Sequence, residues 1–187
     1  MTRQAVSNSK PCLPHGVRQA TAADRTRLSS LIDSAFSTEP FPDGSGSDED
    51  HLAAMMRKGE FLLAEDAAGQ LLGCIYTEIR DSRAYLGRVF ARVRGESRNA
   101  RGYVDRHVVD PESRGAGIGR LLIEAAEDYL RCQGCDAIDL TVPSLRTDLL
   151  SIYHRFGYVQ NGAQEIPATQ PLKLGIDSRF LVLSKDL

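Results

Sequence analysis

A glycine-rich turn between an expected strand and an expected helix is the segment whose residue types and spacing point most directly to chemistry. Residues 108–122 read Val-Val-Asp-Pro-Glu-Ser-Arg-Gly-Ala-Gly-Ile-Gly-Arg-Leu-Leu. Glycines let the backbone come close to a ligand and adopt angles that other residues avoid. The first turn of a helix adds unpaired N–H groups and the positive end of its dipole. With Arg114 and Arg120 beside it, this segment predicts a pocket for a phosphate or a pyrophosphate.

Two other phosphate-binding patterns fit this turn less well. A P-loop needs Lys and then Ser or Thr after its last glycine, whereas Gly119 is followed by Arg-Leu. A dinucleotide-binding fingerprint needs Gly-x-Gly-x-x-Gly directly after the first strand. Here the glycines alternate at 115, 117 and 119, late in the chain. Asp139 does lie about 20 residues further on, as a ribose-binding acid would. A tight strand-to-helix turn that binds nothing also stays open.

The elements that must position this turn follow from hydrophobic spacing and from turn residues. Helices are expected where apolar residues recur at helical spacing. These stretches follow Thr21, follow Ser47, run from Ile118 to Tyr129 and cover 148–156. Strands are expected at about 17–20, 60–65, 71–79, 103–109, 137–142, 158–160 and 180–183. Residues 80–100 fit either an extended hairpin or a loop. Strands separated by helices in this order predict an α/β fold, a mixed sheet with helices packed on its faces.

Length and composition bound the class of protein. The chain has 187 residues, near the rough prior of about 150 for one domain, so we expect one domain at 17–187 after a flexible lead-in at 1–16. A hydrophobic content of 42% suffices for a core. The net charge of −2 disfavours a nucleic-acid binder that relies on overall positive charge. No apolar run approaches the ~20 residues of a membrane helix, and the start lacks a secretory pattern, which predicts a cytoplasmic protein.

The pair Cys132 and Cys135 has the spacing of half a zinc site or of a redox dithiol. The sequence has no second pair at zinc-like spacing, and its four histidines are scattered. Because the pair falls where a helix ends and a buried strand begins, we interpret these cysteines as small apolar residues, and no metal is predicted.

The turn also carries a family resemblance. Arg114-x-x-Gly117-x-Gly119 matches the Arg/Gln-x-x-Gly-x-Gly/Ala signature of the GNAT superfamily of acetyl-CoA-dependent N-acetyltransferases. Residues 152–158, Ile-Tyr-His-Arg-Phe-Gly-Tyr, resemble the second recurring stretch of that family, and the element order over 17–187 is similar. The resemblance implies a single-domain α/β fold with a mixed, mostly antiparallel central sheet and helices on both faces. It further implies acetyl transfer from acetyl-CoA to an amine by direct attack in a ternary complex.

The resemblance also implies which residues hold acetyl-CoA. Backbone N–H groups of the turn would bind the pyrophosphate. The preceding strand would pair with the pantetheine arm and offer an N–H to the thioester oxygen. Ser144 lies where many relatives have an Asn that contacts the coenzyme. The coenzyme-binding residues predicted in this way are His107, Val108, Val109, Arg114, Gly115, Ala116, Gly117, Ile118, Gly119, Arg120 and Ser144.

Two catalytic roles remain to be filled. A free alkylamine has a pKa near ~10.4, so a group or a water chain must remove a proton before attack. The resemblance implies Tyr153 as the acid that protonates the leaving thiolate, with plain core packing as the alternative. Strand alternation places Tyr103, Asp105 and His107 on one face. We choose Asp105 as the base; His107, a water relay from backbone groups, or an ion pair with a nearby arginine stay open.

Two charged segments bear on the acceptor. One lies between the first two expected helices and either attracts a cationic amine or merely carries helix-start charges; its acidic residues are Glu39, Asp43, Asp48, Glu49 and Asp50. The other, over 80–106, holds eight arginines and suits an acidic acceptor, an RNA surface or a solvated hairpin. The expected acceptor is an amine of a small molecule or of a protein, and a homodimer stays open. The alternative function is a non-catalytic coenzyme A-binding regulatory module on the same fold.

Overall fold

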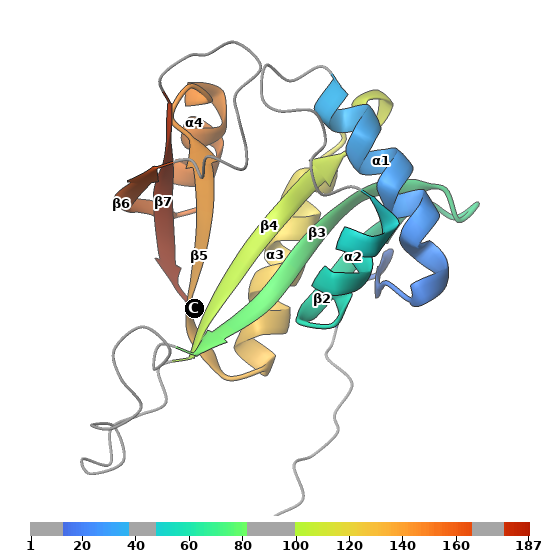
Figure 1. Cartoon of the computed structure of the whole chain (residues 1–187), viewed down its shortest axis with the longest axis horizontal. Helices are drawn as coiled ribbons and strands as arrows, with labels where there is room; N and C mark the ends of the chain where they lie inside the picture. The colour runs from blue at the N-terminus through green and yellow to red at the C-terminus, as the bar shows by residue number, and fades with distance from the viewer. Residues whose placement is uncertain (1–12, 38–47, 82–99, 166–177) are drawn as a thin grey trace, which may run out of the picture.

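The computed structural model describes residues 13–37, 48–81, 100–165 and 178–187 (Figure 1). These residues form a seven-stranded sheet with the order β1-β2-β3-β4-β5-β7-β6. The strands are β1 (Val17–Gln19), β2 (Gly59–Glu65), β3 (Leu71–Asp81), β4 (Ala100–Val109), β5 (Cys135–Pro143), β6 (Val159–Glu165) and β7 (Arg179–Asp186). β4 and β5 run parallel, and the other neighbouring pairs are antiparallel. The predicted mixed, mostly antiparallel sheet is confirmed.

Helices cover both faces of this sheet, as predicted. On one face α1 (Arg25–Ser37) and α2 (Glu49–Met56) bury residues such as Leu28 and Leu52 against β2 and β3. On the other face α3 (Ile118–Cys132) and α4 (Thr147–Arg155) share a second core with β5 and β7 (Figure 1). α3 buries one side because its apolar residues recur at helical spacing, with Leu122 and Ala126 fully buried. Each core removes apolar surface from water and so holds its helices on the sheet.

The elements follow one another in the predicted order, with their ends shifted. Most of the expected lead-in and the Arg-rich part of 80–100 lie outside the described residues. Leu13 packs against the core that contains α3, and the amide of Glu65 donates to the carbonyl of Gly16. The lead-in at 1–16 therefore stays a prediction. In the described ranges, no helix is both long and apolar enough to cross a membrane.

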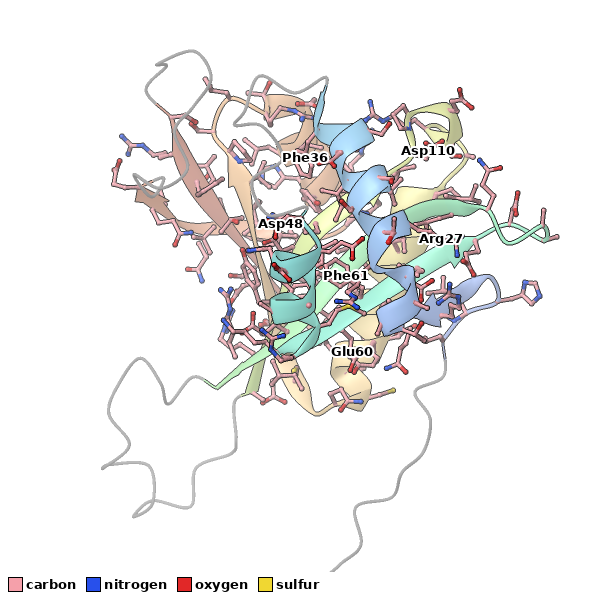
Figure 2. All side chains as sticks on the ribbon, turned by 45° about the vertical axis from the view of Figure 1, so that its right-hand side comes forward. Arg27, Phe36, Asp48, Glu60, Phe61 and Asp110 are labelled. Carbon is pink, nitrogen blue, oxygen red and sulfur yellow. The ribbon has the colours of Figure 1, made fainter. Side chains whose placement is uncertain are left out.

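An ion-pair cluster fixes the start of α1 against the sheet. Arg18 on β1 donates to both oxygens of Asp24, at 2.7 and 2.9 Å, and to both oxygens of Glu65 at the end of β2. Arg27, which Figure 2 labels on α1, donates to the same Glu65 at 2.9 Å. These bonds hold the pKa of Asp24 well below its usual value, chiefly because of Arg18. The amide of Thr21 also donates to Asp24 at 2.7 Å, one of the two bonds of a capping box.

β4 and β5 separate at one end of the sheet, and this separation creates the site. Their pairing runs from Ala100 opposite Cys135 to Val104 opposite Leu140 and then stops. Beyond that point the two strands diverge (Figure 1). The hydroxyls of Tyr103 and Thr141 lie 3.1 Å apart, where the strands begin to part. The C-terminal halves of β4 and β5 therefore leave part of their backbone free to face a ligand.

A bulge in β4 corrects one prediction from the sequence. Asp105 lies opposite Tyr76, but Val108 lies opposite Cys74, so β4 holds one residue more than β3 in this stretch. Arg106, inside the bulge, has a φ of 47°. The extra residue reverses the alternation of side chains. Asp105 shares the face of Tyr76, which is the α1 and α2 face, whereas the His107 side chain bonds to α3 and α4 on the opposite face. The prediction that Asp105 and His107 share a face is wrong.

Candidate active site

A cavity of about 930 Å³ lies where β4 and β5 diverge. One wall is the second half of β4 and the first turn of α3, and the opposite wall is the end of β5 with α4. The C-terminal part of α1 borders it with Ile32, Ala35 and Phe36. Figure 2 shows Phe36 at the end of α1 and Asp110 beyond the end of β4, both at the same end of the sheet. The cavity thus draws its lining from both faces of the sheet.

The glycine turn forms one end of this cavity. β4 ends at Val109, a 3-10 turn follows at Pro111–Ser113, and α3 begins at Ile118. Gly115 and Gly117 both have a φ of 83°, a left-handed conformation that side chains other than glycine rarely adopt. A Cβ placed at either glycine would meet no heavy atom within 4 Å, so open space lies beside this backbone. The first-turn N–H groups of α3 cannot be satisfied inside the helix, and they are available to an anion.

The charge of the lining favours a polyanion. The charged side chains that line the cavity are Arg106, Arg114, Arg120, Arg146 and Arg155, with Asp105 and Asp148. Arg120 also pairs with Glu124 at 2.8 Å on the exposed side of α3, and Arg146 donates to both oxygens of Asp148 at the start of α4. The positive excess, together with the helix dipole of α3, attracts phosphate groups.

A chain of hydrogen bonds crosses the cavity wall from α3 to α4. The Nε2 atom of His107 lies 2.8 Å from the carbonyl oxygen of Gly119, and its Nδ1 atom lies 2.9 Å from the hydroxyl of Tyr153. A carbonyl only accepts, so Nε2 carries the hydrogen in the neutral ring, and Nδ1 accepts from Tyr153. Burial lowers the pKa of His107 to about 4, so the ring is neutral near pH 7. Burial, followed by the charge of Asp105, raises the pKa of Tyr153.

Tyr153 packs in the core, and its hydroxyl also bonds to a residue of the cavity wall. Its ring lies edge-on to Phe156 and Tyr158 in the α3 and α4 core, at centroid distances of 6.4 and 5.7 Å. Its hydroxyl nevertheless reaches His107, and both residues line the cavity. Core packing therefore fixes the ring, and the hydroxyl bonds to His107 in the cavity wall.

Asp105 lies on the cavity wall from the α1 side. One of its oxygens accepts the backbone N–H of Arg106 at 2.7 Å and lies 3.3 Å from the Arg106 guanidinium. The carboxylate side chain is 39% exposed. An ion pair with a neighbouring arginine, one of the readings of this residue that the sequence allowed, is thus present.

The predicted site residues gather around the cavity with two exceptions. The lining includes Asp105, His107, Val108, Val109, Arg114, Gly115, Gly117, Ile118, Gly119, Arg120 and Tyr153, but not Ala116 or Ser144. The hydroxyl of Ser144 accepts the N–H of Arg179 at 3.3 Å and lies 3.2 Å from the hydroxyl of Ser178. These bonds direct Ser144 toward the start of β7, and its contact with the coenzyme stays a prediction.

Sequence reasoning missed the part of the lining that comes from distant segments. α1 contributes an apolar edge ending in Phe36, while Gln164 of β6 and Phe180 of β7 border the same cavity. No motif marks these residues, because only the fold brings them to the site. Arg146 and Arg155 at the two ends of α4 had a signal, since they flank the Tyr153 motif in the sequence.

In the described part of the acidic segment before α2, the acidic side chains bond to the helices α1 and α2. Asp48 accepts the N–H of His51 at 2.8 Å and caps α2, and Glu49 accepts the hydroxyl of Thr26 from α1 at 2.7 Å. Glu39 and Asp43 lie outside the described residues. Among the residues that the structure describes, no group of three His, Cys, Asp or Glu side chains is placed to hold a metal ion.

Comparison with known families decides what kind of protein carries this cavity. A family model described as the acetyltransferase (GNAT) family matches residues 26–158. The chain belongs to this family. The matched part of the GNAT chain includes the glycine turn, His107 and Tyr153, and therefore most of the cavity lining.

Curated relatives carry a more specific name. A mycothiol acetyltransferase of Salinispora tropica is 38% identical over 103 residues, which cover 54% of this chain and 29% of that protein. A mycothiol acetyltransferase of Pseudarthrobacter chlorophenolicus is 30% identical over 168 residues, which cover 86% of this chain and 48% of that protein. The GNAT chain thus spans about half or less of the length of these relatives.

Solved structures agree on the fold. A GNAT superfamily phosphinothricin acetyltransferase from Sinorhizobium meliloti, solved in complex with AcCoA, superposes with a TM-score of 0.66 at 19% identity. The match covers 91% of this chain and 87% of that one. At this identity the similarity shows the GNAT fold.

Proposed function

We propose that this GNAT protein is an N-acetyltransferase, in which an amine directly attacks acetyl-CoA while both substrates are bound. The observation that carries the proposal is that the glycine turn and the Tyr153 hydroxyl border one cavity. The turn suits a diphosphate and the hydroxyl suits proton transfer, so a single cavity offers both parts of the reaction. A regulatory module that only binds coenzyme A would need the turn but not the buried hydroxyl.

The residues of the turn fit acetyl-CoA. Open space lies beside Gly115 and Gly117, and a phosphate there would meet the first-turn amides of α3. Arg114 borders the same end of the cavity and supplies permanent charge. The edge of β4 beyond Val104, which no longer pairs with β5, is where the amides of a pantetheine arm would bond.

The proposed reaction moves one proton from nitrogen and delivers one to sulfur. The amine nitrogen attacks the thioester carbonyl, a C–N bond forms, and the C–S bond breaks with its electron pair on sulfur. Tyr153 keeps its proton at neutral pH because burial raises its pKa, and it is the proposed donor to the thiolate. Asp105, a partly exposed carboxylate on the cavity wall, is the proposed acceptor of the proton from the amine.

The test is release of free thiol from acetyl-CoA in the presence of an amine panel, with acetylated product confirmed by mass. We expect turnover with at least one amine, and saturation that depends on both substrates without a stable acetyl-enzyme. Tight binding of acetyl-CoA with no thiol release from any amine would instead favour the regulatory module. An acetyl group trapped on the protein in the absence of amine would exclude direct attack.

The acceptor panel follows from the relatives and from the cavity. Because the relatives are named for mycothiol, an amine of the mycothiol type belongs in the panel. The GNAT chain spans only part of those proteins, so other small amines and peptide amines are included. Action in the cytoplasm and assembly as a homodimer remain predictions, tested by fractionation and by light scattering.

A further inference from the structure

The bulge in β4 places an imidazole where strand alternation would not. Because of the extra residue, the His107 side chain points to the α3 and α4 face and lies between the first turn of α3 and Tyr153. Both ring nitrogens are engaged within the wall of the cavity, at 2.8 Å from Gly119 and 2.9 Å from Tyr153. The ring therefore links the turn that suits the diphosphate to the hydroxyl that suits the chemistry.

The two contacts fix where the protons lie. The carbonyl of Gly119 requires a hydrogen on Nε2, so the neutral ring has a bare lone pair on Nδ1. The Tyr153 hydroxyl donates its hydrogen to that lone pair, which leaves the lone pairs of the phenol oxygen for the cavity. In this resting arrangement Tyr153 presents an acceptor to an incoming amine, and its own proton lies toward His107.

We propose that His107 is the positioning residue of Tyr153 and briefly stores the proton that passes from nitrogen to sulfur. The inference rests on the proposed acetyl transfer. This route for the amine proton is an alternative to the one through Asp105, which lies on the other face of β4.

The proton steps balance within the pair. As the C–N bond forms, the nitrogen gives one proton to the Tyr153 oxygen, and the phenol proton passes to Nδ1 of His107, which becomes an imidazolium. As the C–S bond breaks, Nδ1 returns its proton to the phenol oxygen, which protonates the thiolate. Burial disfavours the imidazolium, so it returns the proton readily, and the pair ends as it began.

Paired substitutions separate this role from packing. His107→Gln keeps a donor that reaches Gly119, and His107→Asn keeps an acceptor near Tyr153, but neither side chain can hold the extra proton. We expect both to lower kcat by about 100-fold or more, in line with loss of one proton-transfer group, with KM for acetyl-CoA changed less than about threefold. In both variants turnover should rise with buffer-base concentration, because the proton must now pass through solvent. His154→Asn, at an exposed histidine next to Tyr153, is the matched control and should leave all three readouts unchanged.

A double-mutant cycle adds a readout that simple destabilisation does not give. If His107 acts through Tyr153, then Tyr153→Phe with His107→Asn should lose no more kcat than Tyr153→Phe alone. Additive losses of kcat in the double variant would overturn the proposal. So would wild-type kcat in both His107→Gln and His107→Asn. Neither result would contradict the acetyl transfer itself.

Nitrogen NMR tests the proton positions without any turnover. At pH 7 the His107 ring should show a protonated Nε2 and a bare Nδ1, and Tyr153→Phe should shift only Nδ1 to the value of a free lone pair. A ring protonated on Nδ1 would overturn the inference whatever the activity. Failure of the wild-type chain to acetylate any amine would remove the proposed function but would leave the tautomer result readable.

Discussion

A small chemical change can isolate the role of the Tyr153 hydroxyl, because the core holds the ring and the residue lines the cavity. Tyr153→Phe keeps the ring contacts with Phe156 and Tyr158. We expect kcat to fall by about 10²- to 10⁴-fold, the usual worth of a general acid, with the Kd of acetyl-CoA nearly unchanged. Steady-state rates and calorimetric titration measure the two effects. Unchanged turnover would leave Tyr153 as a packing residue.

The buried imidazole of His107 predicts an acid-sensitive stability. Its pKa falls from 6.5 to about 4 on folding. Between pH 6.5 and 4 the unfolded chain therefore binds a proton at His107 that the folded chain does not bind. Stability should therefore be unaffected by this group above pH 6.5 and should fall as the pH drops toward 4, by at most about 3 kcal/mol. Urea unfolding of wild type and His107→Asn at several pH values between 7.5 and 4 measures the difference.

The matched histidine again serves as the control for this pH dependence. His154 is exposed, and His154→Asn should show the wild-type slope. Carboxyl groups whose pKa is depressed in the fold, such as Asp24 beside Arg18, lose their contribution to stability mainly below about pH 4. Equal slopes for wild type and His107→Asn between pH 6.5 and 4 would show that the imidazole takes up its proton as easily in the folded protein as in the unfolded one.

At the scale of elements, periodic patterns were readable from the sequence and a local irregularity was not. α3 was predicted with its start at Ile118 because apolar residues repeat at helical spacing and glycines precede it. The bulge in β4 left no such signal, since the residue with positive φ is Arg106 rather than a glycine. One extra residue put Asp105 and His107 on opposite faces of β4 and so separated the two candidate proton-transfer groups. The sequence thus predicted which residue types occur in the site, but not which side chains they bond to.

A substitution at Gly73 on β3 tests how closely β3, β4 and α3 pack against one another. A Cβ there would lie 2.7 Å from the carbonyl oxygen of Val108 and 2.9 Å from the Leu122 side chain. Gly73→Ala should therefore push β4 and the start of α3 apart and cost about 1–3 kcal/mol, as overpacking of a core does. Thermal unfolding measures the loss, which for a chain of this size is a Tm decrease of about 2–12 °C.

The same substitution should weaken the site, because Val108 and the start of α3 both line the cavity. We expect the Kd of acetyl-CoA for folded Gly73→Ala to rise as well. Ala68→Ser, at the exposed turn between β2 and β3, is a control that should change neither quantity. A Gly73→Ala protein with wild-type Tm and Kd would mean that the contact among β3, β4 and α3 adjusts without cost.

At the scale of the whole molecule, the site depends on how two parts of one sheet are joined. β1 to β4 form one part and β5 to β7 the other, and their pairing covers only the first half of β4. Lining residues from α1 and from β7, far apart in sequence, meet across the gap. Sequence patterns are local, so they predicted the turn and the Tyr153 motif but not the α1 and β7 side of the cavity. That side exists only once the sheet is assembled.

A ligand that fills this gap touches both parts of the sheet, so its binding should stabilise the whole molecule. At a free concentration of 100 times Kd, acetyl-CoA should add about 2.7 kcal/mol, which corresponds to a Tm increase of about 5–11 °C for this chain length. Differential scanning fluorimetry measures it, and the shift should shrink at high salt because the phosphates meet arginines. Gly117→Ala is the matched control, since its Cβ would enter the open space beside the turn. Measured against its own ligand-free Tm, that variant should shift far less at the same acetyl-CoA concentration; an equal shift would place the diphosphate elsewhere.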